Sequence, residues 1–321
     1  MIIEFKNKIE SYDNLISVSK GLAKEYKNIL SYVTIGKSHD NRDILLLKLG
    51  LGQRYLICCG GVHARETINP LVLLRIIEYY ADLYNNYKQQ RFDLKKKLKT
   101  GANHFIEEYE QMLYSSCIYE LLQTYTILFV PLLNPDGYMI SLEGFEAIQD
   151  GALRDQCLSM KLDYKEWKYN ARGIDINRNF PSKLWTKKAP QDKAASENET
   201  KALISLFNKY KSEGFLDFHS RGRSIYYYRS MMSENYNVKQ LQIANRLKDI
   251  TNYVLVPPVD EIESGDSGGN TVHYYSEYFH KPALTIETVD EDANFPLDCQ
   301  YYQSTFEELK LVISEFGSLV I

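Results

Sequence analysis

The chain has 321 residues, of which 44% are hydrophobic and 25% charged, and its formal net charge at pH 7 is −4. This composition is typical of a globular protein, and the acidic balance argues against a nucleic-acid partner. Charged side chains interrupt the first ten residues, and no apolar run reaches the length of a transmembrane helix. We therefore expect a cytoplasmic protein without a membrane segment.

The five cysteines are odd in number and show no C-x-x-C spacing. This pattern favours neither a disulfide framework nor a thiolate zinc site. Cys58 and Cys59 lie in an apolar run that predicts a strand, so we expect two small buried side chains on opposite faces of a sheet.

Short apolar runs rich in β-branched and aromatic residues alternate with longer helical patterns along the chain. The predicted strands are Tyr32–Ile35, Ile44–Leu49, Tyr55–Cys59, Tyr125–Leu133, Gly214–Phe218, Ser224–Tyr228 and Ala283–Val289. The predicted helices are Tyr12–Leu30, Asn69–Asn85, Ile106–Leu122, Ser196–Lys211, Val238–Tyr253, Thr271–Phe279 and Gln303–Phe316. The alternation predicts an α/β fold with a mixed, mostly parallel sheet and helices on both faces.

No internal repeat or flexible linker divides the chain, so we expect one domain over residues 1–321. Residues 1 to about 30 form a helical lead-in in this interpretation. The basic, glycine-interrupted stretch at about 88–104 is expected to be a peripheral excursion, and Lys183–Glu199 a surface loop.

The stretch GGVHARETINP, residues 60–70, places His63, Arg65 and Glu66 directly after a predicted strand. A zinc site in a hydrolase commonly uses three histidine or carboxylate ligands and keeps one position open for water. The H-x-x-E pattern can supply two of these ligands. Taken alone, the same pattern also fits an ordinary solvated turn.

Two further strand ends carry polar side chains. His219 closes the apolar run FLDFHS, and Glu287 lies within ALTIETV. Ligands in open α/β sheets bind at the carboxyl ends of strands. His219 could therefore be a metal ligand or a structural histidine. Glu287 could be a general base or a solvent-facing residue of an amphipathic strand.

The segment GIDINRNFP, residues 173–181, presents Asn177 beside Arg178. An arginine guanidinium binds a carboxylate through two parallel hydrogen bonds, so this pair suits a substrate carboxylate. The earlier segment NPDGY, residues 134–138, predicts a structural turn that closes a strand.

The order and spacing of these five motifs resemble the zinc metallocarboxypeptidases of the carboxypeptidase A type. The resemblance extends from about Tyr12 to Phe316. Within that family, the segments WKYNARGIDINRNFP and FHSRGRSIYYY look most like the bacterial branch that includes γ-D-glutamyl-L-diamino acid endopeptidases. The resemblance implies an eight-stranded twisted mixed sheet between helices.

The resemblance also implies a role for each motif residue. One Zn²⁺ per chain would be held by His63, Glu66 and His219, with Glu287 as the general base. Asn177 and Arg178 would bind the carboxylate of the residue after the cleaved bond, and Arg65 would help to hold the substrate.

The chain departs from the animal carboxypeptidases at three points. The arginine that stabilises the oxyanion follows a tryptophan in those enzymes, whereas here Lys168 follows Trp167 and Arg172 comes four residues later, so either cation could serve. Their mobile tyrosine aligns with Ser264, unless a nearby tyrosine such as Tyr274 replaces it. The position that often sets side-chain preference falls at or near Thr271.

Three functions remain open on this basis. The first is a zinc peptidase that cleaves next to a residue with a free carboxylate, with γ-D-glutamyl-diamino acid bonds of peptidoglycan peptides as substrates. The second is a general cytosolic metallocarboxypeptidase. The third is a non-catalytic module that binds peptides or muropeptides, against which the complete set of ligands and Glu287 argue.

Overall fold

The computed structural model describes residues 9–99, 106–261 and 267–320. Its sheet has eight strands in the order β1-β2-β4-β3-β5-β8-β6-β7. Four pairings are parallel and three antiparallel, as predicted for a mixed sheet. The strands are β1 (Leu30–Lys37), β2 (Asp43–Leu49), β3 (Arg54–Gly60), β4 (Tyr125–Val130), β5 (Ser212–Ser220), β6 (Ser224–Tyr226), β7 (Val254–Leu255) and β8 (Ala283–Thr288).

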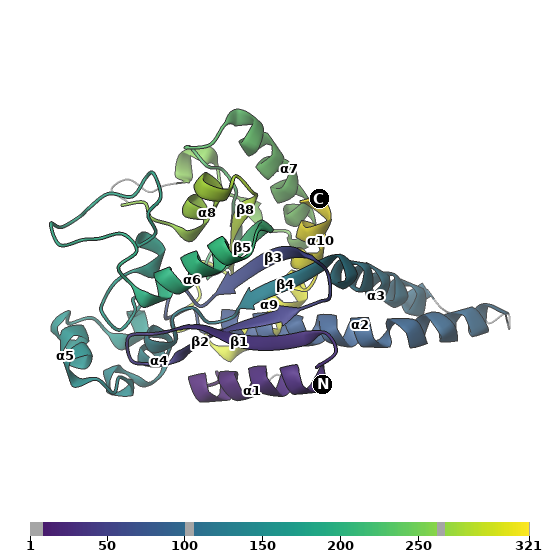
Figure 1. The fold of residues 1–321 in the computed structure, drawn as a ribbon, viewed down its shortest axis with the longest axis horizontal. Coiled ribbons are helices and arrows are strands. Elements are labelled where there is room, and N and C mark those ends of the chain that lie inside the picture. Colours follow the sequence, from purple (N-terminus) through teal and green to yellow (C-terminus); the bar gives the residue numbers. More distant parts are fainter. Residues whose placement is uncertain (1–8, 100–105, 262–266, 321) are drawn as a thin grey trace.

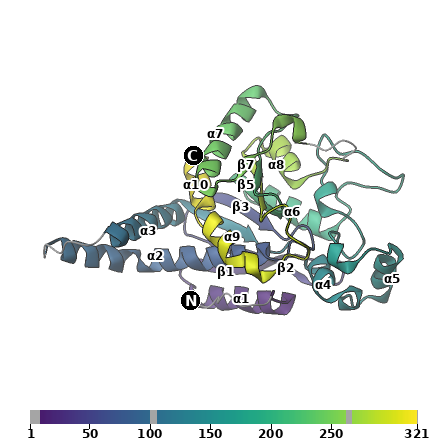
Figure 2. The same cartoon turned by 180° about the vertical axis from the view of Figure 1, so that it is seen from behind.

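Helices cover both faces of this sheet (Figures 1 and 2). One face carries α1, α2, α3, α7, α9 and α10, and the other carries α6 and α8. The helices are α1 (Tyr12–Glu25), α2 (Asn69–Lys99), α3 (Ile106–Thr124), α4 (Pro135–Glu143), α5 (Gly151–Ser159), α6 (Asn198–Lys209), α7 (Glu234–Thr251), α8 (Thr271–Phe279), α9 (Tyr302–Leu309) and α10 (Val312–Leu319). The α/β fold expected from the sequence is confirmed.

The strands divide their side chains between two apolar cores. In β3, Leu56 and Cys58 join the core under α2, whereas Ile57 and Cys59 join the core under α6 and α8. Successive side chains of a strand point to opposite faces, which explains why the central strands read as unbroken apolar runs. Both cysteines are buried free thiols, as predicted.

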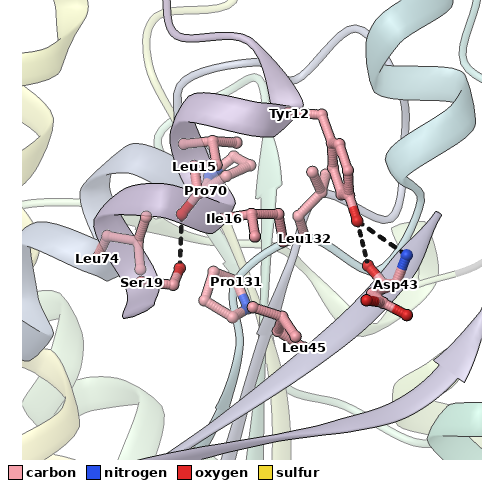
Figure 3. A pocket seen from close by; sticks show the side chains of 10 residues that line it. All are labelled: Tyr12, Leu15, Ile16, Ser19, Asp43, Leu45, Pro70, Leu74, Pro131 and Leu132. Carbon is pink, nitrogen blue, oxygen red and sulfur yellow. Dashed lines mark hydrogen bonds between the residues drawn. The ribbon is translucent and has the colours of Figure 1, made fainter. Parts of the chain in front are cut away.

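Helix α1 is held against the sheet by an apolar stripe and one polar contact. Ser11 caps its first turn, and Leu15 and Leu22 lie on its buried side. The Tyr12 hydroxyl accepts a hydrogen bond from the Asp43 N–H (2.8 Å) and donates one to the Asp43 carbonyl oxygen (3.2 Å), as Figure 3 shows. The small apolar pocket in Figure 3 contains none of the predicted site residues, so it belongs to the packing of α1.

Several predicted elements have different bounds in the structure. The helix predicted over Tyr12–Leu30 ends at Glu25, because β1 begins at Leu30. The helix predicted over Gln303–Phe316 is divided into α9 and α10, and the sequence analysis missed α5 and the two-residue strand β7. No helix of the described segments has both the length and the apolar character needed to cross a membrane.

Two predicted loops are helical. The segment NPDGY is not a turn, because Asn134 caps α4, which starts at Pro135. Residues 88–99 of the expected excursion continue α2, and residues 100–105 lie outside the described residues. Together with α3, this part of α2 projects beyond the sheet (Figures 1 and 2).

Candidate active site

Three parallel neighbours in the sheet bring the predicted catalytic motifs together. Strand β3 pairs with β5, and β5 pairs with β8. His63 follows the end of β3, and His219 on β5 lies opposite Glu287 on β8. Because the carboxyl ends of parallel strands meet at one edge of the sheet, residues far apart in the sequence converge there.

His63, Glu66 and His219 form a compact cluster at this edge. The Nδ1 atom of His63 lies 2.7 Å from Glu66 Oε1 and 3.2 Å from His219 Nδ1. Glu66 Oε2 lies 3.4 Å from His219 Nδ1. The side chains of Glu66 and His219 are almost fully buried, and that of His63 is 16% exposed. The three residues that the sequence analysis predicts as metal ligands therefore lie together at this edge of the sheet.

The cluster suits a zinc ion. Two imidazole nitrogens and one carboxylate converge on a common point, and this is a donor set that catalytic zinc sites use. Glu66 Oε2 and Glu287 Oε2 are buried without a hydrogen-bond partner among the described residues. Buried polar atoms normally have partners, so these atoms indicate a site built for a ligand.

Each histidine of the cluster has a second carboxylate next to its Nε2 atom. Asp175 Oδ1 lies 3.3 Å from His63 Nε2, and Asp217 Oδ2 lies 3.0 Å from His219 Nε2. A carboxylate in this position fixes the orientation of a metal-binding imidazole and raises its basicity. Sequence analysis missed both residues. A signal for Asp217 was available, because positions two apart on a strand share a face.

The two glutamates of the site have opposite pKa shifts. Burial raises the pKa of Glu66, but the neighbouring His63 and His219 outweigh burial and lower that pKa to about 2. Burial dominates at Glu287 and raises its pKa to about 7. The environment therefore favours a charged carboxylate at Glu66 and one that exchanges protons more readily at Glu287.

Backbone contacts position the loop that carries His63. Gly61 has φ +60°, and a Cβ there would lie 3.2 Å from the Leu132 Cα and closer still to its side chain. Glycine accepts this conformation without strain. The Asn134 side chain donates to the carbonyl oxygens of Val62 and Tyr169, each at 3.1 Å. Asn134 thus ties the His63 loop to the segment beside Lys168, a role that sequence analysis did not assign.

Asn177 and Arg178 line the same pocket as His63 and Glu287. They lie in the short 3-10 helix η3 (Ile176–Arg178), which Asp175 caps through the Asn177 N–H at 3.0 Å. Asn177 Oδ1 accepts a hydrogen bond from the Thr271 N–H at 3.0 Å, and this bond fixes the direction of the amide. The structure thus places the predicted carboxylate-binding pair beside the candidate metal site.

The two candidates for the oxyanion cation occupy different surroundings. Lys168 Nζ lies 2.8 Å from Asp175 Oδ2, and Asp175 in turn contacts His63. Arg172 Nη1 instead lies 3.3 Å from Glu197 Oε1, and the other oxygen of that carboxylate lies 3.0 Å from His39 Nε2. The geometry connects Lys168, rather than Arg172, to the metal cluster.

Arg65 is not among the residues that line the pocket. Its Nη1 donates to Glu166 Oε2 at 2.7 Å, and its guanidinium lies 4.1 Å from the centre of the Phe295 ring. These contacts hold the side chain at the rim of the His63 loop, so its expected role in substrate binding stays a prediction.

Two further positions that the sequence analysis noted, Tyr274 and Thr271, do not line the pocket. Ser264 lies outside the described residues. Tyr274 packs in the apolar core against Phe180 and Phe207 and does not line the pocket, whereas Tyr226 does. Thr271 is fully buried, with its hydroxyl hydrogen-bonded to Asp217.

Comparisons with known proteins agree with this site. A family model described as zinc carboxypeptidase matches residues 15–308. Over 197 residues, the chain is 23% identical to gamma-D-glutamyl-L-diamino acid endopeptidase 1 of Lysinibacillus sphaericus, and the match covers 57% of this chain and 46% of that protein. Over 196 residues, it is 28% identical to carboxypeptidase D of Drosophila melanogaster, covering 61% of this chain and 12% of that protein.

Both matches span less than half the length of these relatives. The crystal structure of carboxypeptidase A from Helicoverpa armigera superposes with a TM-score of 0.69 at 18% identity, covering 99% of this chain and 75% of that one. This likeness shows a common fold. Because the family model spans most of the sequence, the chain belongs to the zinc carboxypeptidase family, a family of zinc-dependent metallopeptidases.

Proposed function

We propose that this protein hydrolyses an amide bond next to a residue with a free carboxylate, and that γ-D-glutamyl-diamino acid bonds of peptidoglycan peptides are its substrates. The observation that carries the proposal is one pocket in which the His63 cluster, Glu287 and Arg178 meet. His63, Glu66 and His219 would hold one zinc ion per chain.

Each group of the site has a separate role in the hydrolysis. A bound zinc supplies Lewis-acid chemistry, because it acidifies water and polarises a carbonyl group. Glu287 accepts the proton of the attacking water and delivers it to the departing amine. Lys168, placed by Asp175, supplies positive charge where the oxyanion develops.

Arg178 and Asn177 determine which bond is cleaved. The guanidinium of Arg178 binds the carboxylate of the leaving residue, and Asn177 donates a further hydrogen bond. In a muropeptide, the carboxylate of the diamino acid occupies the place that a peptide C-terminus takes in a carboxypeptidase. The similarity to the endopeptidase of Lysinibacillus sphaericus supports this choice of substrate.

A cycle of enzyme and substrate changes tests the proposal. Amidation of the leaving residue's carboxylate should reduce kcat/KM strongly for the wild type and much less for Arg178→Ala, because the binding partner is already absent. Equal cleavage of free-acid and amidated substrates by the wild type would contradict the carboxylate clamp. L-Ala-γ-D-Glu-diaminopimelate and plain C-terminal peptides are offered side by side, with products identified by mass spectrometry.

The same assay separates the other functions. The similarity to carboxypeptidase D favours a general carboxypeptidase as the second candidate, and hydrolysis of plain peptides alone would support it. A non-catalytic module would bind both peptides without turnover. The cytoplasmic location stays a prediction, which cell fractionation tests.

A further inference from the structure

The segment that carries Asp175 and the carboxylate-binding pair begins and ends at a buried asparagine. Asn170 is fully buried, and Asn179 is 4% exposed. The only regular structure between them is the single turn of η3. A segment without a strand or a longer helix depends on other hydrogen bonds to keep one shape. The position of the carboxylate-binding pair therefore depends on how these two asparagines are held.

Asn170 closes the first half of this segment and ties it to α6. Its Oδ1 accepts hydrogen bonds from the backbone N–H groups of Arg172 at 3.0 Å and Ile174 at 3.1 Å. Its backbone N–H donates to the Ile174 carbonyl oxygen at 3.0 Å. Its Nδ2 donates to Glu197 Oε2 at 2.8 Å and, at 3.3 Å, to Glu199 Oε2. The chain thus enters η3 from a turn that is bound to the start of α6.

Asn179 fastens the other end of the segment to the same place. Its Oδ1 accepts the Glu197 N–H at 3.1 Å. Its Nδ2 donates to Ser196 Oγ at 2.9 Å and to the Lys193 carbonyl oxygen at 3.0 Å. The Ser196 hydroxyl donates in turn to Glu197 Oε1 at 2.6 Å. Glu197 therefore binds Asn170 through its side chain and Asn179 through its backbone, so one residue holds both ends of segment 170–179.

The carboxylate of Glu197 is buried and fully occupied. Arg172 Nη1 lies 3.3 Å from its Oε1, and His39 Nε2 lies 3.0 Å from its Oε2. Together with the donors from Asn170 and Ser196, these contacts fill the four acceptor sites of a carboxylate. The group of His39 and two glutamates at this place therefore anchors the segment instead of holding a further metal ion.

We propose that Glu197 is a positioning residue for the reaction. By holding both ends of segment 170–179, it sets where Asp175 and Arg178 lie relative to the metal cluster. Glu197 is not among the residues that line the pocket, so it acts through this segment and not on the substrate. A displacement of about 1 Å can reduce a rate by about 10²-fold. The inference rests on the proposed function, because it concerns the placement of the carboxylate clamp.

The preference for free-acid over amidated substrates tests this role. For each variant, kcat/KM is measured for a peptide that the wild type cleaves and for the same peptide with the carboxylate of its leaving residue amidated. A variant that only folds less well has fewer active molecules for both substrates, so the ratio of the two kcat/KM values stays the same. A displaced Arg178 lowers the ratio, because only the free acid uses its guanidinium.

Glu197→Gln should lower this ratio by at least about tenfold, because the new amide meets the donors of Asn170 and Ser196 with one acceptor oxygen instead of two. Glu213→Gln is the matched control. Glu213 lies at the amino end of β5 and pairs with Arg54 and Lys281, far along the strand from His219. This control should keep the wild-type ratio. An unchanged ratio in Glu197→Gln would overturn the inference and leave the proposed function intact.

A paired substitution tests whether the contact itself carries the effect. Asn170→Asp alone sets two carboxylates against each other and should also lower the ratio. Asn170→Asp combined with Glu197→Gln restores one donor and one acceptor, with the direction of the hydrogen bond reversed. We expect the double variant to recover the wild-type ratio to within about threefold. A double variant no better than Glu197→Gln would contradict the inference, and if Asn170→Asp does not fold, Glu197→Gln alone decides.

Failure of the proposed function has a different signature. The wild type would then show no turnover, or equal kcat/KM for free-acid and amidated substrates. In that case zinc affinity decides the inference, because segment 170–179 also carries Asp175, which lies next to His63. Competition with a chromophoric chelator, without substrate, should show about tenfold weaker zinc binding in Glu197→Gln. Equal zinc affinity of this variant and the wild type would overturn the inference.

Discussion

Lys168 and Arg172 show how contacts favour one of two candidates for a role that spacing left open. Both cations follow Trp167, and the sequence alone favours neither. In the structure, Lys168 touches Asp175, which contacts His63, whereas Arg172 contacts Glu197 in a separate buried cluster. The choice between them depends on how the loop folds and not on its sequence pattern.

This difference gives a prediction with an internal control. Lys168→Gln should lower kcat by about 10²–10³-fold, as removal of one oxyanion-stabilising group commonly does. Arg172→Gln should leave kcat within a few-fold of the wild type. Steady-state kinetics on one substrate measure both, and a larger loss in Arg172→Gln would reverse the assignment.

Asp175 gives a second prediction at the residue scale. Asp175→Asn removes the carboxylate behind His63 and should weaken zinc binding by about 10–100-fold. Competition with a chromophoric chelator measures the zinc affinity. Asp155→Asn, an exposed carboxylate on α5, is the control. Unchanged zinc affinity in Asp175→Asn would mean that this carboxylate does not support the metal site.

The predictable residues were those inside short motifs. His63 and Glu66 lie in the loop after β3, and His219 and Glu287 lie near the ends of β5 and β8, where the sequence pattern already indicates a site. Arg229 and Glu261, which also line the pocket, could not be predicted in this way. Their side chains are buried and approach each other although 32 positions separate Arg229 from Glu261 in the sequence, and a hydropathy pattern reports neither property.

The start of α6 holds two glutamates with opposite electrostatics, Glu197 at the N-cap and Glu199 in the first turn. Burial opposes ionisation of Glu197, but hydrogen bonds from His39, Ser196 and Asn170 outweigh it and lower the pKa to about 2. Burial dominates at Glu199 and raises its pKa to about 7. One helix start thus holds one carboxylate that stabilises the fold when charged and one that stabilises it when neutral.

The pH dependence of stability should differ in sign between these two positions. The folded pKa of Glu199 lies above the unfolded value near 4.5, so its contribution is lost as the pH rises from 4.5 through 7. Glu199→Gln should match the wild type near pH 5 and be more stable at pH 8.5, by at most about 3 kcal/mol.

Glu197→Gln is the matched variant. Its folded pKa is depressed, so the contribution of the carboxylate is present above pH 4.5 and is lost toward pH 2. This variant should therefore be less stable than the wild type at both pH 5 and pH 8.5. Urea unfolding at the two pH values measures the differences, and shifts of equal sign in both variants would refute the account.

Element types were easier to predict than element ends. The alternating pattern identified seven of the eight strands, because each carries an apolar run. The missing strand β7 has two residues and no pattern of its own. The segment NPDGY was misread because Pro-Asp-Gly is a turn signal, whereas an asparagine cap followed by proline also starts a helix.

The sheet is built from both halves of the chain. Strand β3 from the first half pairs with β5 from the second, and α10 packs against both α3 and α7. This interleaving supports the single domain expected from the sequence, which stays a proposal.

One domain should unfold in one cooperative step. We expect far-ultraviolet circular dichroism and tryptophan fluorescence to report the same midpoint. Added zinc should raise that midpoint, since a ligand that binds only the folded state stabilises it. Two separated transitions, or two stable fragments after limited proteolysis, would contradict the single domain. The order of the strands in the sheet could not be predicted from the sequence pattern, because it depends on pairing between distant segments.

The position of β8 has a consequence for biosynthesis. It is the last strand in the sequence, yet in the sheet it lies between β5 and β6. Until residues 283–288 have been synthesised, β5 and β6 lack the strand that lies between them, and Glu287 is absent. A chain that stops before β8 would therefore carry all three proposed metal ligands and still lack the proposed base. We therefore expect hydrolytic activity only after β8 has been made.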